Sequence, residues 1–147
     1  MYETYSSGTE TAAYFAEAVL RSHAHNVTVQ KAHETNLDYF KTFDLIILAS
    51  PSWSVDDQDG QPHINYKQLF EKVNETSFAG KKFAIFGLGD TSYAHFCGAV
   101  DKLELFIRVH GGELLTDSLR IDSFYFDKEK NEAILRNWIN QLNTHLS

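Results

Sequence analysis

The chain has 147 residues, of which 43% are hydrophobic and 14% aromatic, so residues 1–147 are long enough to bury the core of a single domain. The formal net charge of −7 argues against nucleic acid as a partner and favours a basic protein partner, although a soluble acidic protein explains this charge equally well. No apolar run reaches the ~20 residues of a membrane span and no basic, apolar leader is present, so we expect no membrane association and a cytoplasmic location. The single cysteine, Cys97, excludes an internal disulfide bond and a cysteine-based metal site.

Apolar runs alternate with segments of helical periodicity along the chain. The predicted elements are, in order, a helix over 11–22, strands over 27–29 and 45–49, a helix over 64–73, a strand over 83–86, a helix over 95–110, a strand over 114–121 and a helix over 127–146. This alternation predicts an α/β protein whose parallel sheet is covered by helices on both faces, a three-layer α/β/α sandwich.

A polar loop precedes the first predicted helix and reads Thr4-Tyr5-Ser6-Ser7-Gly8-Thr9. Backbone N–H groups and hydroxyls at a helix N-terminus can bind a phosphate without any basic residue. A helix N-cap that is simply rich in Ser and Thr would have the same sequence. Taken alone, the loop leaves both interpretations open.

Two further loops follow apolar strands. The strand over 45–49 leads into Pro51-Ser52-Trp53-Ser54, and the strand over 83–86 leads into Leu88-Gly89-Asp90, then Tyr93, then His95-Phe96-Cys97. Open α/β sheets bind ligands at the carboxyl ends of their strands. Exposed aromatic residues beside an acid suit a flat ring with polar edges. Each residue also has an ordinary interpretation: exposed loop aromatics, an aspartate that makes a turn, and a small buried cysteine.

Together the three loops resemble those of the flavodoxins, small FMN-containing electron carriers, and the length resembles their short-chain type. The family phosphate loop reads Ser/Thr-x-Thr-Gly-Asn-Thr-Glu, and Thr4, Ser6 and Thr9 match its hydroxyl positions, whereas Ser7 and Gly8 depart from its Gly and Asn. The resemblance implies non-covalent binding of FMN by the following residues: Thr4, Tyr5, Ser6, Ser7, Gly8, Thr9, Pro51, Ser52, Trp53, Ser54, Leu88, Gly89, Asp90, Tyr93, His95, Phe96 and Cys97.

The resemblance also implies roles for individual residues. Trp53 and Tyr93 would lie on either side of the isoalloxazine ring, and Asp90 would accept a hydrogen bond from the ring N3–H. His95 stands where the family has a Tyr, and Ser54 stands where many relatives have Gly. No metal site is implied.

One element of the family is short in this sequence. The implied fold is a flavodoxin-like doubly wound parallel sheet of order 2-1-3-4-5, whose central first strand precedes the phosphate loop. Here only Met1, Tyr2 and Glu3 precede Thr4, so we expect strand 1 to be truncated. Either the chain begins late, or another chain completes the sheet; without such a chain we expect a monomer.

The function that the resemblance implies is a low-potential one-electron carrier that moves electrons between redox proteins and is not an enzyme. Asp56, Asp57 and Asp59 would repel negative charge on a reduced flavin, although a solvated acidic loop explains each of them equally well. A donor reductase and an acceptor oxidoreductase would dock through an acidic surface of the protein. Two alternatives remain open: a flavin-dependent quinone or NAD(P)H reductase on the same fold, and a flavin-free interaction module.

Overall fold

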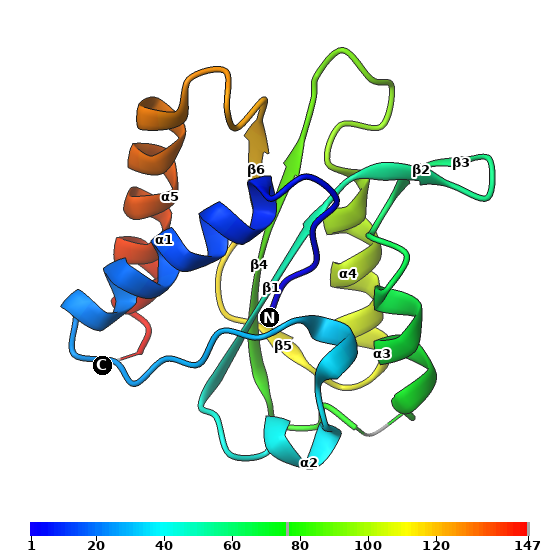
Figure 1. Cartoon of the computed structure of the whole chain (residues 1–147). Helices are drawn as coiled ribbons and strands as arrows, with labels where there is room; N and C mark the ends of the chain where they lie inside the picture. Colours follow the sequence, from blue (N-terminus) through cyan, green and yellow to red (C-terminus); the bar gives the residue numbers. More distant parts are fainter. Residues whose placement is uncertain (76, 147) are drawn as a thin grey trace.

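A computed structural model describes residues 1–75 and 77–146. Its centre is a parallel sheet in which β1 and β4 are paired from Leu45 opposite Lys82 to Pro51 opposite Leu88. Two short strands pair with the other edge of β4, also in parallel (Figure 1). The strands of this sheet are β1 (Leu45–Pro51), β4 (Lys82–Gly89), β5 (Glu113–Leu114) and β6 (Leu119–Asp122).

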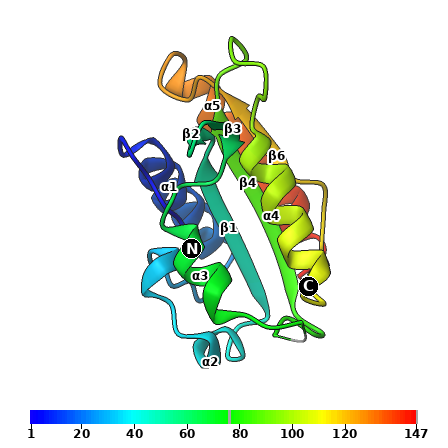
Figure 2. The same ribbon diagram turned by 90° about the vertical axis from the view of Figure 1, so that its right-hand side faces the viewer.

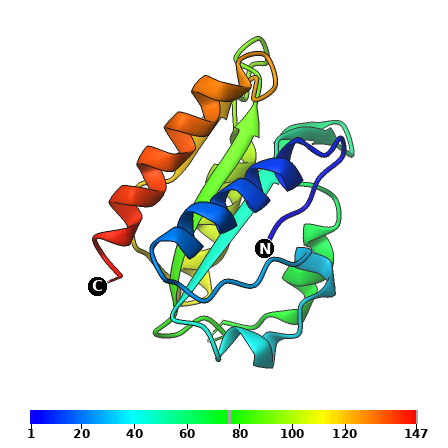
Figure 3. The ribbon, with the colours of Figure 1, turned by 60° about the vertical axis from the view of Figure 1, so that its left-hand side comes forward.

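Helices cover both faces of the sheet. Figure 2 shows α3 and α4 in front of it, and Figure 3 shows α1 and α5 in front of the opposite face. The three-layer α/β/α sandwich predicted from the sequence is therefore confirmed. The helices are α1 (Gly8–Ser22), the single turn η1 (Ala32–Glu34), α2 (Leu37–Phe40), α3 (Tyr66–Lys72), α4 (Gly98–Val109) and α5 (Lys128–Asn143).

The strands are continuously apolar because both of their faces are buried. Successive side chains of a strand point to opposite faces, so Ile46 and Leu48 pack with α3 and α4, whereas Ala49 packs with α1 and α5. In the same way Ile85 of β4 packs with α3 and α4, and Phe86 packs with α1 and α5. The core is thus divided into two hydrophobic clusters, one on each side of the sheet.

The N-terminal residues occupy the central position of the sheet only briefly. Tyr2 forms isolated parallel bridges to Lys31 on one side and Ala49 on the other. The Tyr2 amide donates to the Gln30 carbonyl at 3.1 Å, and the Ala49 amide donates to the Met1 carbonyl at 3.0 Å. The order 2-1-3-4-5 is therefore present: the segment at Lys31 takes position 2, Tyr2 takes position 1, β1 and β4 take positions 3 and 4, and β5 and β6 take position 5. Positions 1 and 2 are each reduced to isolated bridges.

The prediction of a strand over 27–29 is wrong. Val27 and Val29 pack against the α1–α5 cluster but belong to no strand, because residues 1–3 offer them no adjacent backbone to pair with. A cavity of about 340 Å³ lies here, lined by α1, residues 25–29 and β1.

Other boundaries also differ from the prediction. The predicted strand over 114–121 is divided into β5 and β6, and the helix predicted to begin at His95 begins at Gly98, after Cys97 with a positive φ of 52°. A hairpin of β2 (Trp53–Val55) and β3 (Gln58–Gln61) was not predicted. Its turn residues Asp56 and Asp57 have φ of 52° and 60°, the conformation of a type I′ turn. Within residues 1–75 and 77–146, no helix is both long and apolar enough to span a membrane.

Candidate functional site

A pocket of about 700 Å³ opens at the carboxyl ends of β1 and β4. Its volume lies within the range of small-molecule sites. Every residue predicted for the site lines this pocket except Ser7. The structure therefore brings together three loops that are separated by up to about 90 positions in the sequence. Asp59, Ser123, Phe124, Tyr125 and Phe126 complete the lining and were not among the predicted residues.

The first loop wraps the N-terminus of α1. Ser7 adopts a left-handed conformation with φ of 61° at the N-cap, and its side chain makes no capping hydrogen bond. The first backbone N–H groups of the helix consequently have no partner inside the helix and are available to an anion. Thr9 is only 1% exposed at the base of this loop, whereas Ser6 is exposed.

The second loop is held by backbone groups on both sides. The Ser52 amide donates to the Leu88 carbonyl at 2.9 Å, and the Ser52 hydroxyl accepts from the Ala99 amide at 3.0 Å. These bonds fix the direction in which the following residue leaves β1. Trp53 is 57% exposed at the mouth of the pocket, and its ring centroid is 5.3 Å from that of Tyr5.

The third loop is organised around two aspartates. The Asp90 carboxylate accepts from the Ser92 amide at 2.8 Å and from its hydroxyl at 2.6 Å. The Asp122 carboxylate accepts from the Thr91 amide at 3.0 Å and its hydroxyl at 2.8 Å, and these bonds hold the pKa of Asp122 below its usual range. Tyr93 is left 65% exposed beside the pocket.

Close packing beneath the third loop requires small residues. A Cβ at Gly89 would lie 2.9 Å from the Cys97 sulfur, and a Cβ at Gly98 would lie 2.8 Å from the Gly60 backbone. Cys97 is fully buried, and burial raises the pKa of its thiol to about 12, so the thiol stays protonated. Next to it the His95 ring lies 3.2 Å from the Asp59 carboxylate, which joins the hairpin to the third loop.

The loop that sequence reasoning missed follows β6. The Tyr125 hydroxyl lies 2.9 Å from the Thr11 hydroxyl and 3.4 Å from the Ser7 hydroxyl, over the N-terminus of α1. Bonds from those hydroxyls lower the pKa of Tyr125. Phe126 is 93% exposed. The signal was available in the sequence, because this loop also follows the carboxyl end of a parallel strand.

The lining of the pocket has no cationic Lys or Arg side chain. It presents aromatic rings, hydroxyls and backbone amides, together with the carboxylates of Asp59 and Asp90. No group of three or more His, Cys, Asp and Glu residues that could hold a metal ion occurs in the described part of the chain. The site suits an organic ring that carries an anionic group.

Comparison with known proteins supports the same conclusion. A family model described as Flavodoxin matches residues 1–138. "Probable flavodoxin 2" of Bacillus subtilis is 33% identical over 135 residues, which cover 91% of this chain and 87% of that protein. The chain belongs to the flavodoxin family. The flavodoxin of Nitratidesulfovibrio vulgaris is 33% identical over 122 residues, which cover 80% of this chain and 81% of that protein.

Solved flavodoxins have the same fold. The structure of oxidised flavodoxin 2 from Bacillus cereus superposes with a TM-score of 0.85 at 27% identity, with 97% of this chain and 94% of that chain covered. The flavodoxin of Fusobacterium nucleatum bound to flavin mononucleotide has a TM-score of 0.81 at 18% identity, with the same two coverages. Flavodoxins are FMN-binding electron carriers and not enzymes that convert a substrate, and this function applies to a member that matches the family along most of its length.

FMN fits the residues that are present. The pocket is large enough, exposed aromatic rings that include Trp53 and Tyr93 line it, and one end meets the N-terminus of α1. A phosphate at that end needs no cationic side chain, because the helix N-terminus supplies N–H groups and partial positive charge.

Proposed function

We propose that this flavodoxin holds FMN in the pocket between its three loops and carries single electrons at low potential between larger redox proteins. The observation that carries the proposal is the convergence of the three loops on one pocket at the carboxyl ends of β1 and β4. When bound, FMN supplies the redox chemistry, and the residues of the chain bind it, orient it and set the charge around it.

The phosphate lies at the N-terminus of α1 in this proposal. Backbone amides from Gly8 onward and the hydroxyls of Thr4, Ser6 and Thr9 donate to it. Ser7 shapes this loop through its left-handed backbone. Tyr125 adds a phenolic donor from the opposite side, because its hydroxyl already lies within hydrogen-bond distance of Thr11.

The aromatic ring system of the cofactor stacks on Trp53 and Tyr93, the exposed aromatics at the mouth of the pocket. Asp90 and the backbone of Leu88 and Gly89 face its polar edge, and Asp90 is oriented by its bonds to Ser92. The remaining predicted residues, Tyr5, Pro51, Ser52, Ser54, His95, Phe96 and Cys97, shape the walls of the pocket.

Acidic residues place negative charge at and beside this site. Asp59 lines the pocket, and Asp56 and Asp57 form the tip of the same hairpin. Their carboxylates oppose the negative charge that reduction adds, which favours a low potential. The same hairpin offers a docking surface for basic patches of redox partners, and salt should weaken that docking. We place this function in the cytoplasm, in a single domain over 1–147 that acts as a monomer.

Titration with FMN tests the proposal. We expect quenching of flavin fluorescence with one FMN per chain, and weaker binding of riboflavin, which lacks the phosphate. Tyr93→Ala should weaken FMN binding at least about fivefold, since base–aromatic stacking contributes about 1–3 kcal/mol. Tyr39→Ala is a matched control, because Tyr39 is also exposed but lies on α2, away from the pocket. A protein that does not bind FMN at millimolar concentration would contradict the proposal, and rapid steady-state reduction of quinones by NAD(P)H would favour a reductase.

A further inference from the structure

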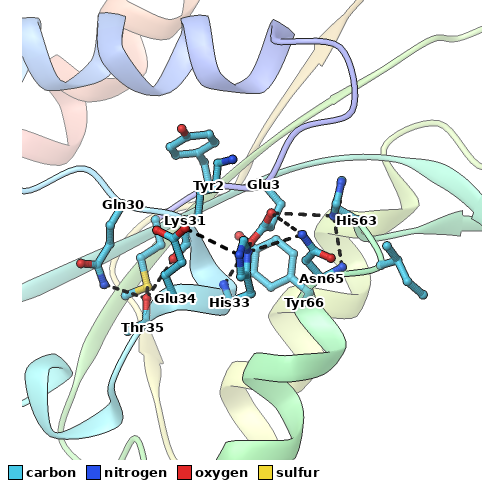
Figure 4. Close-up of polar contacts among 12 residues, drawn as sticks. Tyr2, Glu3, Gln30, Lys31, His33, Glu34, Thr35, His63, Asn65 and Tyr66 are labelled. Carbon is cyan, nitrogen blue, oxygen red and sulfur yellow. Dashed lines mark hydrogen bonds and ion pairs between the residues drawn. The ribbon is translucent and has the colours of Figure 1, made fainter.

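A buried carboxylate lies behind the first loop of the pocket. Glu3 is only 2% exposed, and one of its oxygens accepts from the backbone amide of His33 at 3.0 Å and lies 2.7 Å from the His33 ring. Its other oxygen accepts from the Asn65 side chain at 3.3 Å and lies 3.8 Å from the His63 ring (Figure 4). None of these four residues lines the pocket.

His63 joins this buried cluster to two walls of the pocket. Its backbone amide donates to the Ser50 hydroxyl at 3.0 Å, at the end of β1 where the second loop begins. Its ring stacks on Tyr5 of the first loop with centroids 3.9 Å apart, and Tyr5 in turn contacts Trp53. The Thr4 backbone also faces the His63 side chain and raises the pKa of His63.

The hydrogen bond between the His63 ring and the Asn65 backbone requires the neutral form of the ring, whereas the contact with the Thr4 backbone favours the protonated form. The ring Nδ1 atom accepts from the Asn65 amide at 3.1 Å, and an imidazolium has no acceptor. Protonation would therefore break the bond to the Asn65 backbone and turn Nδ1 into a donor, and the Glu3 carboxylate lies 3.8 Å from this atom. The ring would have to move toward Glu3, away from its present place against Tyr5.

We propose that His63 is a positioning residue for the cofactor pocket: in its neutral form it holds the Thr4–Tyr5 loop against the Ser50–Trp53 loop, and its protonation releases them and weakens flavin binding. The inference rests on the proposed function, because it concerns the same pocket. It adds a pH dependence that comes from behind the pocket and not from a group in contact with the cofactor.

The surroundings of His63 determine the direction of the effect. Burial is the largest influence and lowers the pKa of His63. The negative charge of Glu3 and the backbone of Thr4 raise it, positive charges on His33 and Lys31 lower it, and the net shift is downward. Tyr66, whose hydroxyl donates to the Ala49 carbonyl at 2.9 Å, stays neutral because burial raises its pKa. Glu34 lies 3.7 Å from the far side of the His33 ring. A flavin bound to the neutral arrangement disfavours the proton, so affinity falls as the pH falls.

Riboflavin is the probe that separates this effect from titration of the cofactor. The second pKa of a phosphate monoester is near 6, so FMN affinity alone would mix the two ionisations. We expect the dissociation constant of riboflavin, measured by fluorescence quenching, to rise roughly three- to tenfold between pH 7.5 and pH 5, since one linked proton changes affinity at most about tenfold per pH unit.

Two substitutions in the cluster should change the pH profile of riboflavin binding in different ways. His63→Asn keeps an acceptor for the Asn65 amide but cannot titrate, so it should bind flavin with a flat pH profile. Glu3→Gln removes the charge that favours protonation of His63, so it should move the midpoint of the profile to lower pH. A merely structural defect would lower affinity equally at every pH. His145→Gln, at an exposed position outside α5, should leave the profile unchanged.

The outcomes are distinct from those of the proposed function. FMN binding at pH 8 by the unaltered chain tests the proposed function. If FMN does not bind at pH 8, the proposed function is contradicted, whatever the pH profile of riboflavin binding. The inference is overturned if riboflavin affinity is constant from pH 7.5 to 5, if His63→Asn keeps the full pH dependence, or if His95→Gln abolishes it. His63→Phe, which keeps a ring against Tyr5, replaces His63→Asn if that variant does not fold, and it should also give a flat profile.

Discussion

Two parts of the sheet differ in how they hold the loops of the pocket. In the first part, the β1–β4 side, the two strands are joined by seven register pairs, and the second and third loops begin at their ends. In the second part, the N-terminal side, residues 1–3 are joined to their neighbours by two isolated bridges, and the first loop follows them. Backbone hydrogen bonds therefore position two loops, and the first loop depends on its side chains.

The side-chain contacts of the first loop are correspondingly numerous. The Tyr2 hydroxyl donates to the Glu10 carboxylate at 2.5 Å, and the Glu3 carboxylate binds the His33 amide and ring. The Tyr125 hydroxyl reaches Thr11 from the far side of the pocket. Core substitutions in the paired strands β1 and β4 should therefore lower stability strongly, whereas core substitutions beside residues 1–3 should lower it little, and substitutions in the side-chain contacts of the first loop should lower cofactor affinity.

The largest expected effect is on the well-paired side. Leu48 of β1 is fully buried in the α3–α4 cluster. Leu48→Ala should lower the free energy of unfolding by about 3 kcal/mol, because it removes buried methyl groups and leaves a cavity. Urea unfolding followed by circular dichroism measures this value. Leu105→Ala, on an α4 side chain that is 60% exposed, should change it by less than about 0.5 kcal/mol. A loss below 1 kcal/mol for Leu48→Ala would contradict tight packing on this side.

A second substitution tests the contact between β4 and α4. A Cβ at Gly87 would clash with a methyl group of Val100. Gly87→Ala should therefore destabilise the protein by about 2 kcal/mol through overpacking. The double variant Gly87→Ala, Val100→Ala should be more stable than the sum of the two single changes implies, because the clash is removed. Strict additivity would show that the strand moves away from the helix without cost.

The fold could be predicted from the sequence where both faces of an element are defined by apolar residues. The continuous run from Leu45 to Ala49 predicts β1 for this reason, and the stripe of Ala12, Ala16 and Val19 predicts α1. Val27 and Val29 have the same local preference, but a strand needs a neighbour with free backbone groups, and local sequence does not report whether one is present. Partner availability, and not propensity, decided that segment.

The site was predictable where a residue follows a recognisable strand. Trp53 and Tyr93 stand two and four residues after the ends of β1 and β4, and both lie at the pocket. Tyr125 also follows a predicted strand, the one over 114–121, but it belongs to none of the three loops that carry the family resemblance, so it was not predicted. His63 is adjacent to the pocket only through the packing of its ring on Tyr5, a tertiary contact that spans 58 positions and has no sequence motif.

A smaller effect is expected from Tyr125, and it falls on affinity. Tyr125→Phe removes only the hydroxyl near Thr11 and Ser7. We expect FMN affinity to fall about fivefold, the equivalent of one hydrogen bond of about 1 kcal/mol, with riboflavin affinity unchanged. Fluorescence titrations of the two flavins measure the difference. An equal loss for both would place the hydroxyl near the ring and not near the phosphate. Tyr14→Phe, on the exposed side of α1, is the matched control.

The smallest effect is expected on the side with few backbone hydrogen bonds. Val29 packs against the α1–α5 cluster but lies beside the 340 Å³ cavity and in no strand. Val29→Ala should cost about 0.5 kcal/mol, at the low end for an apolar truncation, because the lost methyl groups enlarge a cavity that already exists. Amide exchange should be faster at residues 27–29 than in β1, since fewer strand hydrogen bonds protect them. A loss of unfolding free energy close to that of Leu48→Ala would mean that the N-terminal side is packed as tightly as the β1–β4 side. The contrast between these two parts of the sheet would then not explain why the first loop depends on side chains.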